Sequence, residues 1–189
     1  KVSRILHLPL QSGSTEVLRK MNRKYTKEQY LELVRKIRKK IPDVLFSTDI
    51  IVGFPGETEE EFDITEKYLE KVHFYEMHVF KYSRRAGTKA AAMPDQIPEE
   101  VKEERQAELM ELQQDIVFDQ AEDRIGEELL VMIEGKVADE NAYVGRTYRD
   151  APNVDGLIFV NTSEELMSGD FAKVKVTGSA DYDLIGELL

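Results

Sequence analysis

The sequence predicts an α/β segment with a parallel sheet, followed by a small antiparallel β-barrel or sandwich. Strand and helix patterns alternate over the first 90 residues, and such alternation indicates βα units and a parallel sheet. Beyond a long helical stretch the hydrophobic period changes, and five short strands follow between turn-rich segments. The chain has 189 residues, which is enough for two small domains with cores of their own.

The alternating part begins with a short apolar strand and two helices. Residues 5–10 (ILHLPL) form the apolar run, and the turn-like QSGS follows it. A short helix is expected from Thr15 to Met21. Thr26 and Gln29 form a capping box, which predicts a second helix that ends at Ile41.

Two more strands and one more helix complete the alternating pattern. Residues 44–52 (VLFSTDIIV) are too apolar for a strand with one solvent-facing side, so they predict a buried strand. The tight turn GFPGE follows, and Thr58 with Glu61 forms a second capping box that opens the next helix. Residues 74–82 (FYEMHVFKY) predict the third strand.

A loop and a long helix separate this part from the five strands. Residues 86–97 predict the loop, and Pro98 suits the first turn of a helix, where its missing N–H needs no partner. The helix is expected to run to about Arg124, with Gly126 as its C-terminal stop. Its inward side chains are expected to be Val101, Leu109, Leu112 and Ile116. The five strands are predicted at residues 128–138, 142–148, 156–160, 171–177 and 182–188.

Composition excludes several kinds of site. The chain has no cysteine, which removes disulfides, thiolate zinc sites and iron–sulfur ligands. His7, His73 and His78 show no metal-ligand spacing, so the sequence predicts no metal site and places them at strand ends or on the surface. No apolar run reaches the roughly 18 residues of a membrane span, and no signal peptide opens the chain. We therefore expect a cytoplasmic protein without a membrane partner.

The segment Ser47–Thr58 (STDIIVGFPGET) is the strongest candidate for a ligand site. Gly53 and Gly56 allow a ligand or a backbone segment to approach closely, and the next helix begins with free N–H groups. Ligands collect at this carboxyl end of parallel strands. The alternative is a plain βα turn that needs its glycines only for geometry. The Lys and Ser/Thr of a phosphate-binding P-loop are missing, which argues against a nucleoside triphosphatase.

Four motifs follow one another in a recognisable order. They are HLPLQSGS (His7–Ser14), MNRKYT (Met21–Thr26), TDIIVGFPGETEEEF (Thr48–Phe62) and FKYSRRAGTKAA (Phe80–Ala91). In that order they resemble the fourth, fifth and sixth strand regions of the radical-SAM methylthiotransferases. The segment PEEVKEER (Pro98–Arg105) and the helix after it resemble the link from that family's barrel to its C-terminal TRAM domain.

The resemblance makes the fold class more specific. It implies the C-terminal half of a radical-SAM (β/α) barrel, in its last three βα units, over residues 1–97. It then implies a connecting helix over residues 98–124 and a TRAM-like, OB-like five-stranded antiparallel β-barrel that binds substrate over residues 125–189.

The resemblance also implies two cofactors, S-adenosylmethionine and 4Fe–4S clusters, in a parent enzyme. The cysteines that bind these clusters are absent here, and the chain starts at Lys1 rather than Met. We therefore expect a piece of a longer protein that has no catalytic residue of its own and is inactive alone. Carried over by motif, the S-adenosylmethionine pocket would use Gln11, Asp49, Ile51, Gly53, Val79 and Phe80. Simple barrel core is the alternative for Ile51, Val79 and Phe80.

The family divides by substrate, which is either adenosine in tRNA or an aspartate of a small-subunit ribosomal protein. The first third of the chain, with QSGS and MNRKYT, looks more like the tRNA enzymes. The C-terminal part looks like the ribosomal-protein enzyme, in the segments EGK (Glu134–Lys136), GRTYRDAPNVDG (Gly145–Gly156), GDFAKVKVTG (Gly169–Gly178) and YDLIGEL (Tyr182–Leu188).

Charge favours the ribosomal-protein substrate. Residues 124–189 carry six Lys and Arg against thirteen Asp and Glu, a net charge of −7 out of −11 for the whole chain. Such a module would repel RNA phosphates and attract a basic ribosomal protein. The polar recognition surface would be Arg146, Arg149, Asp150 and Asp155. An Arg–Asp pair that braces a long loop is the alternative for these residues.

A basic stretch keeps a tRNA substrate open as an alternative. Ten Lys and Arg occur between residues 19 and 40, and they either contact RNA or form the solvated outer face of barrel helices. The sequence thus predicts part of an aspartate methylthiotransferase that acts on a basic small-subunit ribosomal protein. The alternatives are part of a tRNA adenosine methylthiotransferase, or a non-catalytic TRAM module that docks protein or RNA.

Overall fold

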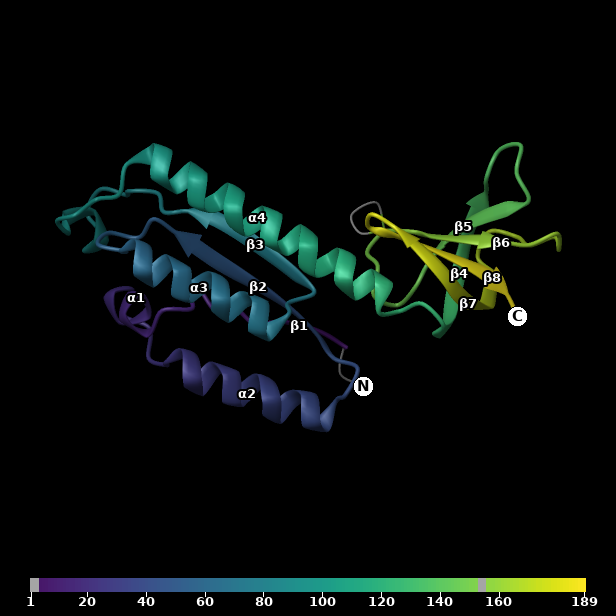
Figure 1. Ribbon diagram of the computed structural model, residues 1–189, viewed down its shortest axis with the longest axis horizontal. Helices are drawn as coiled ribbons and strands as arrows, with labels where there is room; N and C mark the ends of the chain where they lie inside the picture. Colours follow the sequence, from purple (N-terminus) through teal and green to yellow (C-terminus); the bar gives the residue numbers. More distant parts are fainter. Residues whose placement is uncertain (1–3, 153–155) are drawn as a thin grey trace. The chain divides into compact units, whose positions relative to one another are not determined.

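The computed structural model describes residues 4–152 and 156–189, and its contacts divide the chain into two compact units (Figure 1). The division falls between Ile116 and Val117, inside helix α4 (Glu99–Glu122). Among the described helices, none is both long and apolar enough to cross a membrane.

The first unit is built on a three-stranded parallel sheet. Its strands are β1 (Ile5–His7), β2 (Leu45–Val52) and β3 (Glu76–Lys81), in the order β1-β2-β3. The helices between them are α1 (Thr15–Lys20), α2 (Lys27–Lys40) and α3 (Glu59–Val72), and the short 3₁₀ helix η1 (Ala90–Ala92) precedes α4. The predicted parallel α/β arrangement is confirmed.

Strand β1 is shorter than the predicted strand over residues 5–10. Regular pairing ends at His7, and Leu8 N–H still donates to the Ser47 carbonyl at 2.8 Å. The next donor on this side, Leu10 N–H, donates instead to the Thr48 hydroxyl at 2.9 Å, which interrupts the ladder. Pairing resumes at Gln11, whose N–H donates to the Asp49 carbonyl at 2.8 Å while its own carbonyl accepts from Ile51 N–H at 2.9 Å.

Both predicted capping boxes are present. The Thr26 hydroxyl accepts from Gln29 N–H and the Gln29 side chain accepts from Thr26 N–H, so α2 begins where the sequence indicated. Thr58 and Glu61 make the same reciprocal pair at the start of α3. These bonds satisfy backbone N–H groups that the first turn of a helix leaves without partners.

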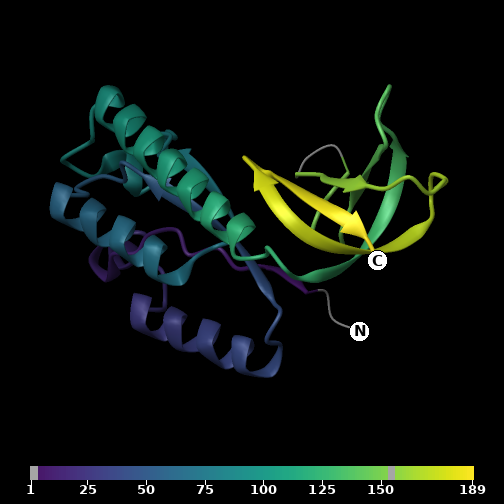
Figure 2. The ribbon, with the colours of Figure 1, turned by 45° about the vertical axis from the view of Figure 1, so that its right-hand side comes forward.

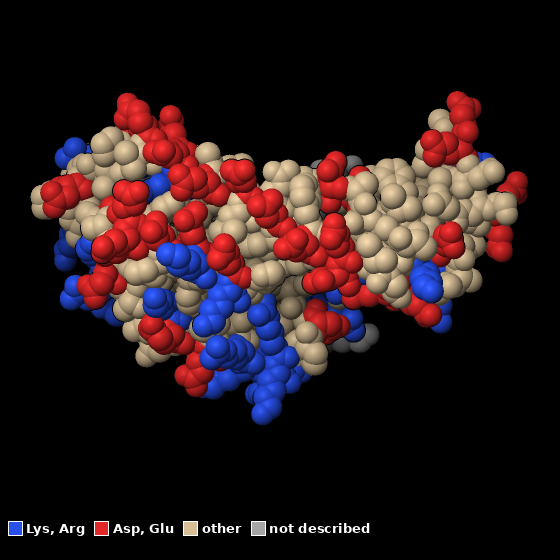
Figure 3. Space-filling model, viewed as in Figure 1, with Lys and Arg blue, Asp and Glu red and all other residues tan. Residues whose placement is uncertain are grey.

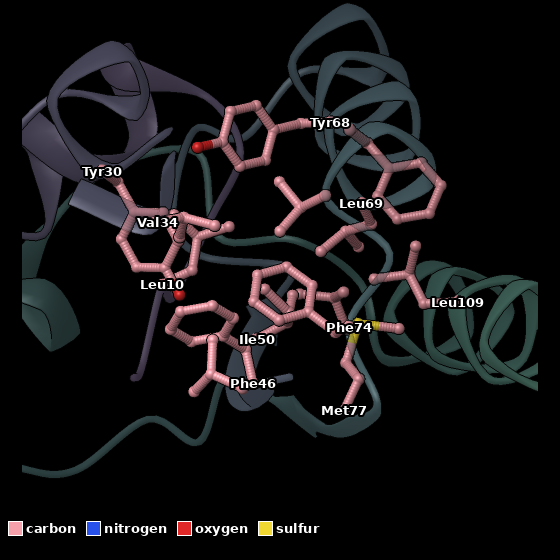
Figure 4. Packing of buried hydrophobic residues seen from close by; sticks show 14 residues of the cluster. Leu10, Tyr30, Val34, Phe46, Ile50, Tyr68, Leu69, Phe74, Met77 and Leu109 are labelled. Carbon is pink, nitrogen blue, oxygen red and sulfur yellow. The ribbon is translucent and has the colours of Figure 1, made fainter. Parts of the chain in front are cut away.

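The core of the first unit lies on one face of the sheet. Alternate residues of β2, namely Phe46, Ile50 and Val52, are at most 1% exposed and pack in one cluster with side chains from α2, α3 and α4. Figure 4 shows Tyr30 and Val34 of α2, Leu69 of α3 and Leu109 of α4 converging on this cluster. The helices therefore cover this face (Figure 2), and the alternation of a strand turns the intervening residues to the opposite face.

Helix α4 differs from the expected amphipathic pattern in its first turns. Leu109 and Ile116 are buried as predicted, and Leu112 packs against the cluster. In the first turns, however, the buried side chains are Lys102 and Arg105, while Val101 is only half-buried. Their partners lie in the turn after β2 and are described with the site below.

The second unit contains a closed five-stranded barrel. Its strands are β4 (Glu128–Lys136), β5 (Ala142–Arg146), β6 (Ile158–Asn161), β7 (Phe171–Ala180) and β8 (Asp183–Leu188), which close in the order β4-β5-β6-β8-β7. The predicted barrel is confirmed. Its interior is apolar and includes Val131, Ile133, Ile158, Val160 and Val174, each fully buried.

One pairing corrects the predicted all-antiparallel arrangement, because β6 and β8 run parallel. The other four pairings in the ring are antiparallel. The reason is parity: strand direction cannot alternate all the way round a closed ring with an odd number of strands, so at least one neighbouring pair must be parallel.

Candidate functional site

Three of the residues predicted to bind the cofactor lie on the sheet face that is opposite to the core. Ile51 of β2 lies beside Phe80 of β3 in the parallel register, and Asp49 precedes Ile51 by two residues on the same face. Phe80 is 52% exposed and Ile51 is half-buried. An exposed aromatic ring beside an aliphatic side chain, with a carboxylate next to them, provides an apolar platform with a polar group at its edge.

Gln11 lies at the carboxyl end of β1, next to this platform, through its bridge to Ile50. Its backbone has a positive φ of 74°, an uncommon conformation for a residue other than glycine. Its side-chain carbonyl accepts from the Arg23 guanidinium at 2.8 Å. The side chain is therefore anchored by Arg23 of the MNRKYT segment.

Gly53 meets a protein side chain at close range. Its φ is +70°, and a Cβ built on it would lie 2.3 Å from Cγ of Lys102. Lys102 then extends to the Tyr82 carbonyl at 3.1 Å and to Glu99 at 3.3 Å. This geometry favours the plain-turn interpretation of Gly53: the glycine makes room for α4.

The same turn contains a buried ion pair. Glu57 accepts from Gly53 N–H and from the Arg105 guanidinium, both at 2.7 Å, and the side chains of Glu57 and Arg105 are 2% and 9% exposed. Burial raises the pKa of Glu57, and this effect outweighs the opposing effects of the Gly53 N–H and of Arg105. The pair connects the GFPGE turn to α4.

Val79 lies on the opposite face from Phe80. It pairs in register with the fully buried Ile50, and its side chain packs against the hydrophobic cluster. Its carbonyl accepts from the Gln106 amide at 2.7 Å. The core interpretation therefore describes the Val79 side chain, and a role for Val79 beside an adenine remains a prediction.

Two of the histidines, expected to be scattered, lie together on the exposed face. Nε2 of His7 is 3.3 Å from Oδ2 of Asp49, and Nδ1 of His78 is 3.5 Å from Oδ1 of the same carboxylate. The two imidazole centroids are 6.2 Å apart. Sequence spacing gave no sign of this cluster because its members come from three strands. Only the register, with His7 opposite Ser47 and Asp49 opposite His78, brings them together.

The described residues predicted to bind substrate in the barrel unit contact other side chains of the same unit. Arg146 pairs with Glu134 across β4 and β5. The Asp150 carboxylate accepts from the N–H and the hydroxyl of Thr147, both at 2.7 Å, which braces the turn after β5. Nε of Arg149 lies 3.1 Å from the Tyr148 hydroxyl. Asp155 lies outside the described residues.

The basic stretch maps to α2 and the segment before it. In Figure 3 the Lys and Arg side chains gather over α2, whereas Asp and Glu cover much of α3 and α4. Some of these cations have partners within the fold: Arg38 donates to the Val72 carbonyl at 2.7 Å, and Lys36 pairs with Glu32 at 2.6 Å. The tRNA alternative therefore depends on the remaining cations of this surface.

Comparison with known families identifies both parts of the chain. Residues 3–69 match the radical SAM superfamily, and residues 125–189 match the TRAM domain. The chain thus matches the radical SAM superfamily in its first part and the TRAM domain in its last part.

Individual relatives narrow the comparison further. The chain is 48% identical over 98% of its length to the ribosomal protein uS12 methylthiotransferase RimO of Lachnoclostridium phytofermentans. It is 43% identical over its full length to the RimO of Desulfitobacterium hafniense, and 45% identical over 98% to that of Clostridium botulinum. It spans 41–42% of the length of these relatives. The predicted resemblance to the radical-SAM methylthiotransferases is confirmed.

The described residues fit the two implied cofactors differently. The platform of Ile51 and Phe80, with Asp49 at its edge, has the apolar surface and a polar group of the kind that a purine nucleoside requires. Gln11 is buried beside it, and its side-chain oxygen accepts from Arg23. An iron–sulfur cluster finds no thiolate ligand, since the chain contains no cysteine. The described surface therefore suits a purine nucleoside, such as that of S-adenosylmethionine, and the chain by itself has no ligand for a cluster.

Proposed function

We propose that this chain is part of a radical-SAM methylthiotransferase that modifies ribosomal protein uS12. The observation that carries the proposal is a single sequence match, at 48% identity, that runs through both units to a uS12 methylthiotransferase. The acidic composition of residues 124–189 supports it, because a module of net negative charge complements a basic protein and repels RNA.

The exposed sheet face would form one wall of the S-adenosylmethionine site. Ile51 and Phe80 would pack against the purine, and Asp49 would accept a hydrogen bond from the nucleoside. S-adenosylmethionine, together with a cluster held by cysteines outside this sequence, would supply the radical and sulfur chemistry. Since this chain has no cluster ligand, we propose that it binds and orients but is catalytically inactive alone.

The barrel unit would dock the substrate protein. Arg149 and Asp150 lie in the turn after β5, and the exposed carboxylates Glu164 and Glu165 lie between β6 and β7. Arg146, paired with Glu134, would hold the strands beneath this turn. Long-range attraction between the acidic barrel and basic uS12 would raise the association rate, and salt would weaken it.

The test measures binding of the whole chain to purified uS12 and, separately, to tRNA across a salt series. We expect salt-sensitive binding to uS12 and none to tRNA. Reversing two barrel charges, Glu164→Lys with Glu165→Lys, should weaken uS12 binding about tenfold or more at low salt. The matched control reverses two exposed charges of the first unit, Glu70→Lys with Glu111→Lys, and should change little. Tight binding to tRNA, lost when the α2 cations are neutralised, would instead support the tRNA enzyme.

A further inference from the structure

We propose that His7, Asp49 and His78 form a binding site for a divalent transition-metal ion. One ligand atom of each residue lies within 4.8 Å of the ligand atoms of the other two, in a group drawn from all three strands of the sheet. The sequence alone predicted no metal site, so this inference rests on the structure. It does not rest on the proposed function, although both proposals use the Asp49 carboxylate.

The separations between ligand atoms suit a metal centre. His7 Nε2 and His78 Nδ1 lie 3.3 and 3.5 Å from the Asp49 carboxylate oxygens. In a tetrahedral site with bonds of about 2.0 Å, neighbouring ligand atoms are about 3.3 Å apart. The two distances to Asp49 are thus already close to those of a tetrahedral site, and all the ligand atoms of the group lie within 4.8 Å of one another.

Each imidazole is also oriented by a second partner. Nδ1 of His7 lies 2.9 Å from the Ser47 hydroxyl, and Nε2 of His78 lies 3.2 Å from the Glu76 carboxylate. The other nitrogen of each ring is thereby left to face Asp49. Metal-binding histidines characteristically use their second nitrogen in this way, which fixes the tautomer and the ring orientation.

The donor set indicates the class of ion. Two imidazoles and one carboxylate suit zinc, cobalt or nickel better than magnesium or calcium, which prefer oxygen ligands alone. Three protein ligands leave at least one coordination position for water or another ligand. His7 and His78 have side chains 48% and 47% exposed, so an ion can reach the site from solvent.

The competing explanation is that these groups only hydrogen-bond with one another. A histidine that contacts a carboxylate at 3.3 Å is a common pairing and needs no ion. The two explanations differ in what they predict for added zinc, and this chain is well suited to the test. It has only three histidines and no cysteine, so His73 is the single remaining strong zinc ligand.

The experiment titrates Zn²⁺ into the untagged 189-residue chain by isothermal calorimetry. We expect one ion per chain, with affinity at least tenfold lower in His7→Gln and in His78→Gln. Ser47→Ala, which alters only the second partner of His7, should weaken binding about tenfold. His73→Gln is the matched control and should bind as the wild type does. His73 lies at the end of α3.

A second measurement covers the case of a variant that does not fold. In the wild-type chain, histidine ring signals in NMR spectra should shift for His7 and His78 on zinc addition and stay in place for His73. The proposal is overturned if wild type binds zinc no more tightly than the double variant His7→Gln/His78→Gln. It is also overturned if the His73 ring responds as the other two do.

Discussion

The buried pair of Glu57 and Arg105 shows how single residues shape the turn after β2. A carboxylate and a guanidinium removed from water are stable only when they neutralise each other and their remaining bonds are made. Glu57 meets this condition through Arg105 and Gly53 N–H, and Arg105 also lies 5.2 Å from the Phe62 ring centroid. The pair therefore specifies where α4 packs. The first turns of α4 were expected to pack through Val101, but their buried side chains are Lys102 and Arg105.

Removing the Arg105 guanidinium should lower the free energy of unfolding, because it leaves the Glu57 carboxylate buried and unpaired. We expect Arg105→Met to destabilise the first unit by roughly 3 kcal/mol or more, because Glu57 is left without its partner. The double variant Glu57→Gln/Arg105→Met, which buries no charge, should recover part of that loss. Urea denaturation followed by circular dichroism measures both variants. Equal losses in the single and double variants would contradict this account.

The same variant should show a distinctive pH dependence. Burial already raises the pKa of Glu57 above its ordinary value of 4.5, and loss of Arg105 should raise it further. The native state then holds a proton at a pH where the unfolded chain has released it. Lowering the pH from 7 toward 4.5 should therefore stabilise Arg105→Met relative to the double variant. A stability difference that stays flat over this range would refute a titrating Glu57.

At the scale of elements, the signals that act locally were readable from the sequence. The capping boxes at Thr26 and Thr58 fix helix starts through residues three positions apart, and both are present. The burial of Lys102 and Arg105, the parallel pairing of β6 with β8, and the group of His7, Asp49 and His78 were not readable. Each depends on which distant segments become neighbours, and a pattern along one chain does not contain that information.

The barrel strands depend on two glycines where neighbouring backbones approach closely. A Cβ at Gly145 would lie 2.7 Å from the Met132 carbonyl oxygen and 2.5 Å from a Val131 methyl, and Gly186 meets β7 in a similar way. We expect Gly145→Ala to destabilise the barrel by about 2 kcal/mol, as overpacking a core does. Thermal unfolding of the variant provides the measurement.

Gly135 is the matched control for this prediction. It lies in the same sheet, and a Cβ built there would meet no atom within 4 Å. Gly135→Ala should therefore change stability by only about 0.5 kcal/mol or less. If the two alanine variants lose equal stability, close packing at Gly145 does not explain the loss.

At the scale of the whole molecule, the two units differ in whether their sheets have unpaired edge strands. The barrel closes on itself, so each of its five strands has two neighbours. In the first unit, β1 and β3 each pair with β2 alone among the described strands. Open edges leave N–H and C=O groups without ladder partners and weaken the cooperative protection of a sheet.

This contrast predicts unequal stability within one chain. We expect native-state hydrogen exchange to show the barrel strands β4, β7 and β8 protected at least tenfold more than β1 and β3. The central strand β2 is the informative comparison, because it has neighbours on both sides. If β2 exchanges more slowly than β1 and β3 but faster than the barrel, the first unit is less stable as a whole. If β2 is protected as strongly as the barrel strands, only the edge strands β1 and β3 open locally. Uniform protection in both units would show that closing the strand edges does not determine their stability.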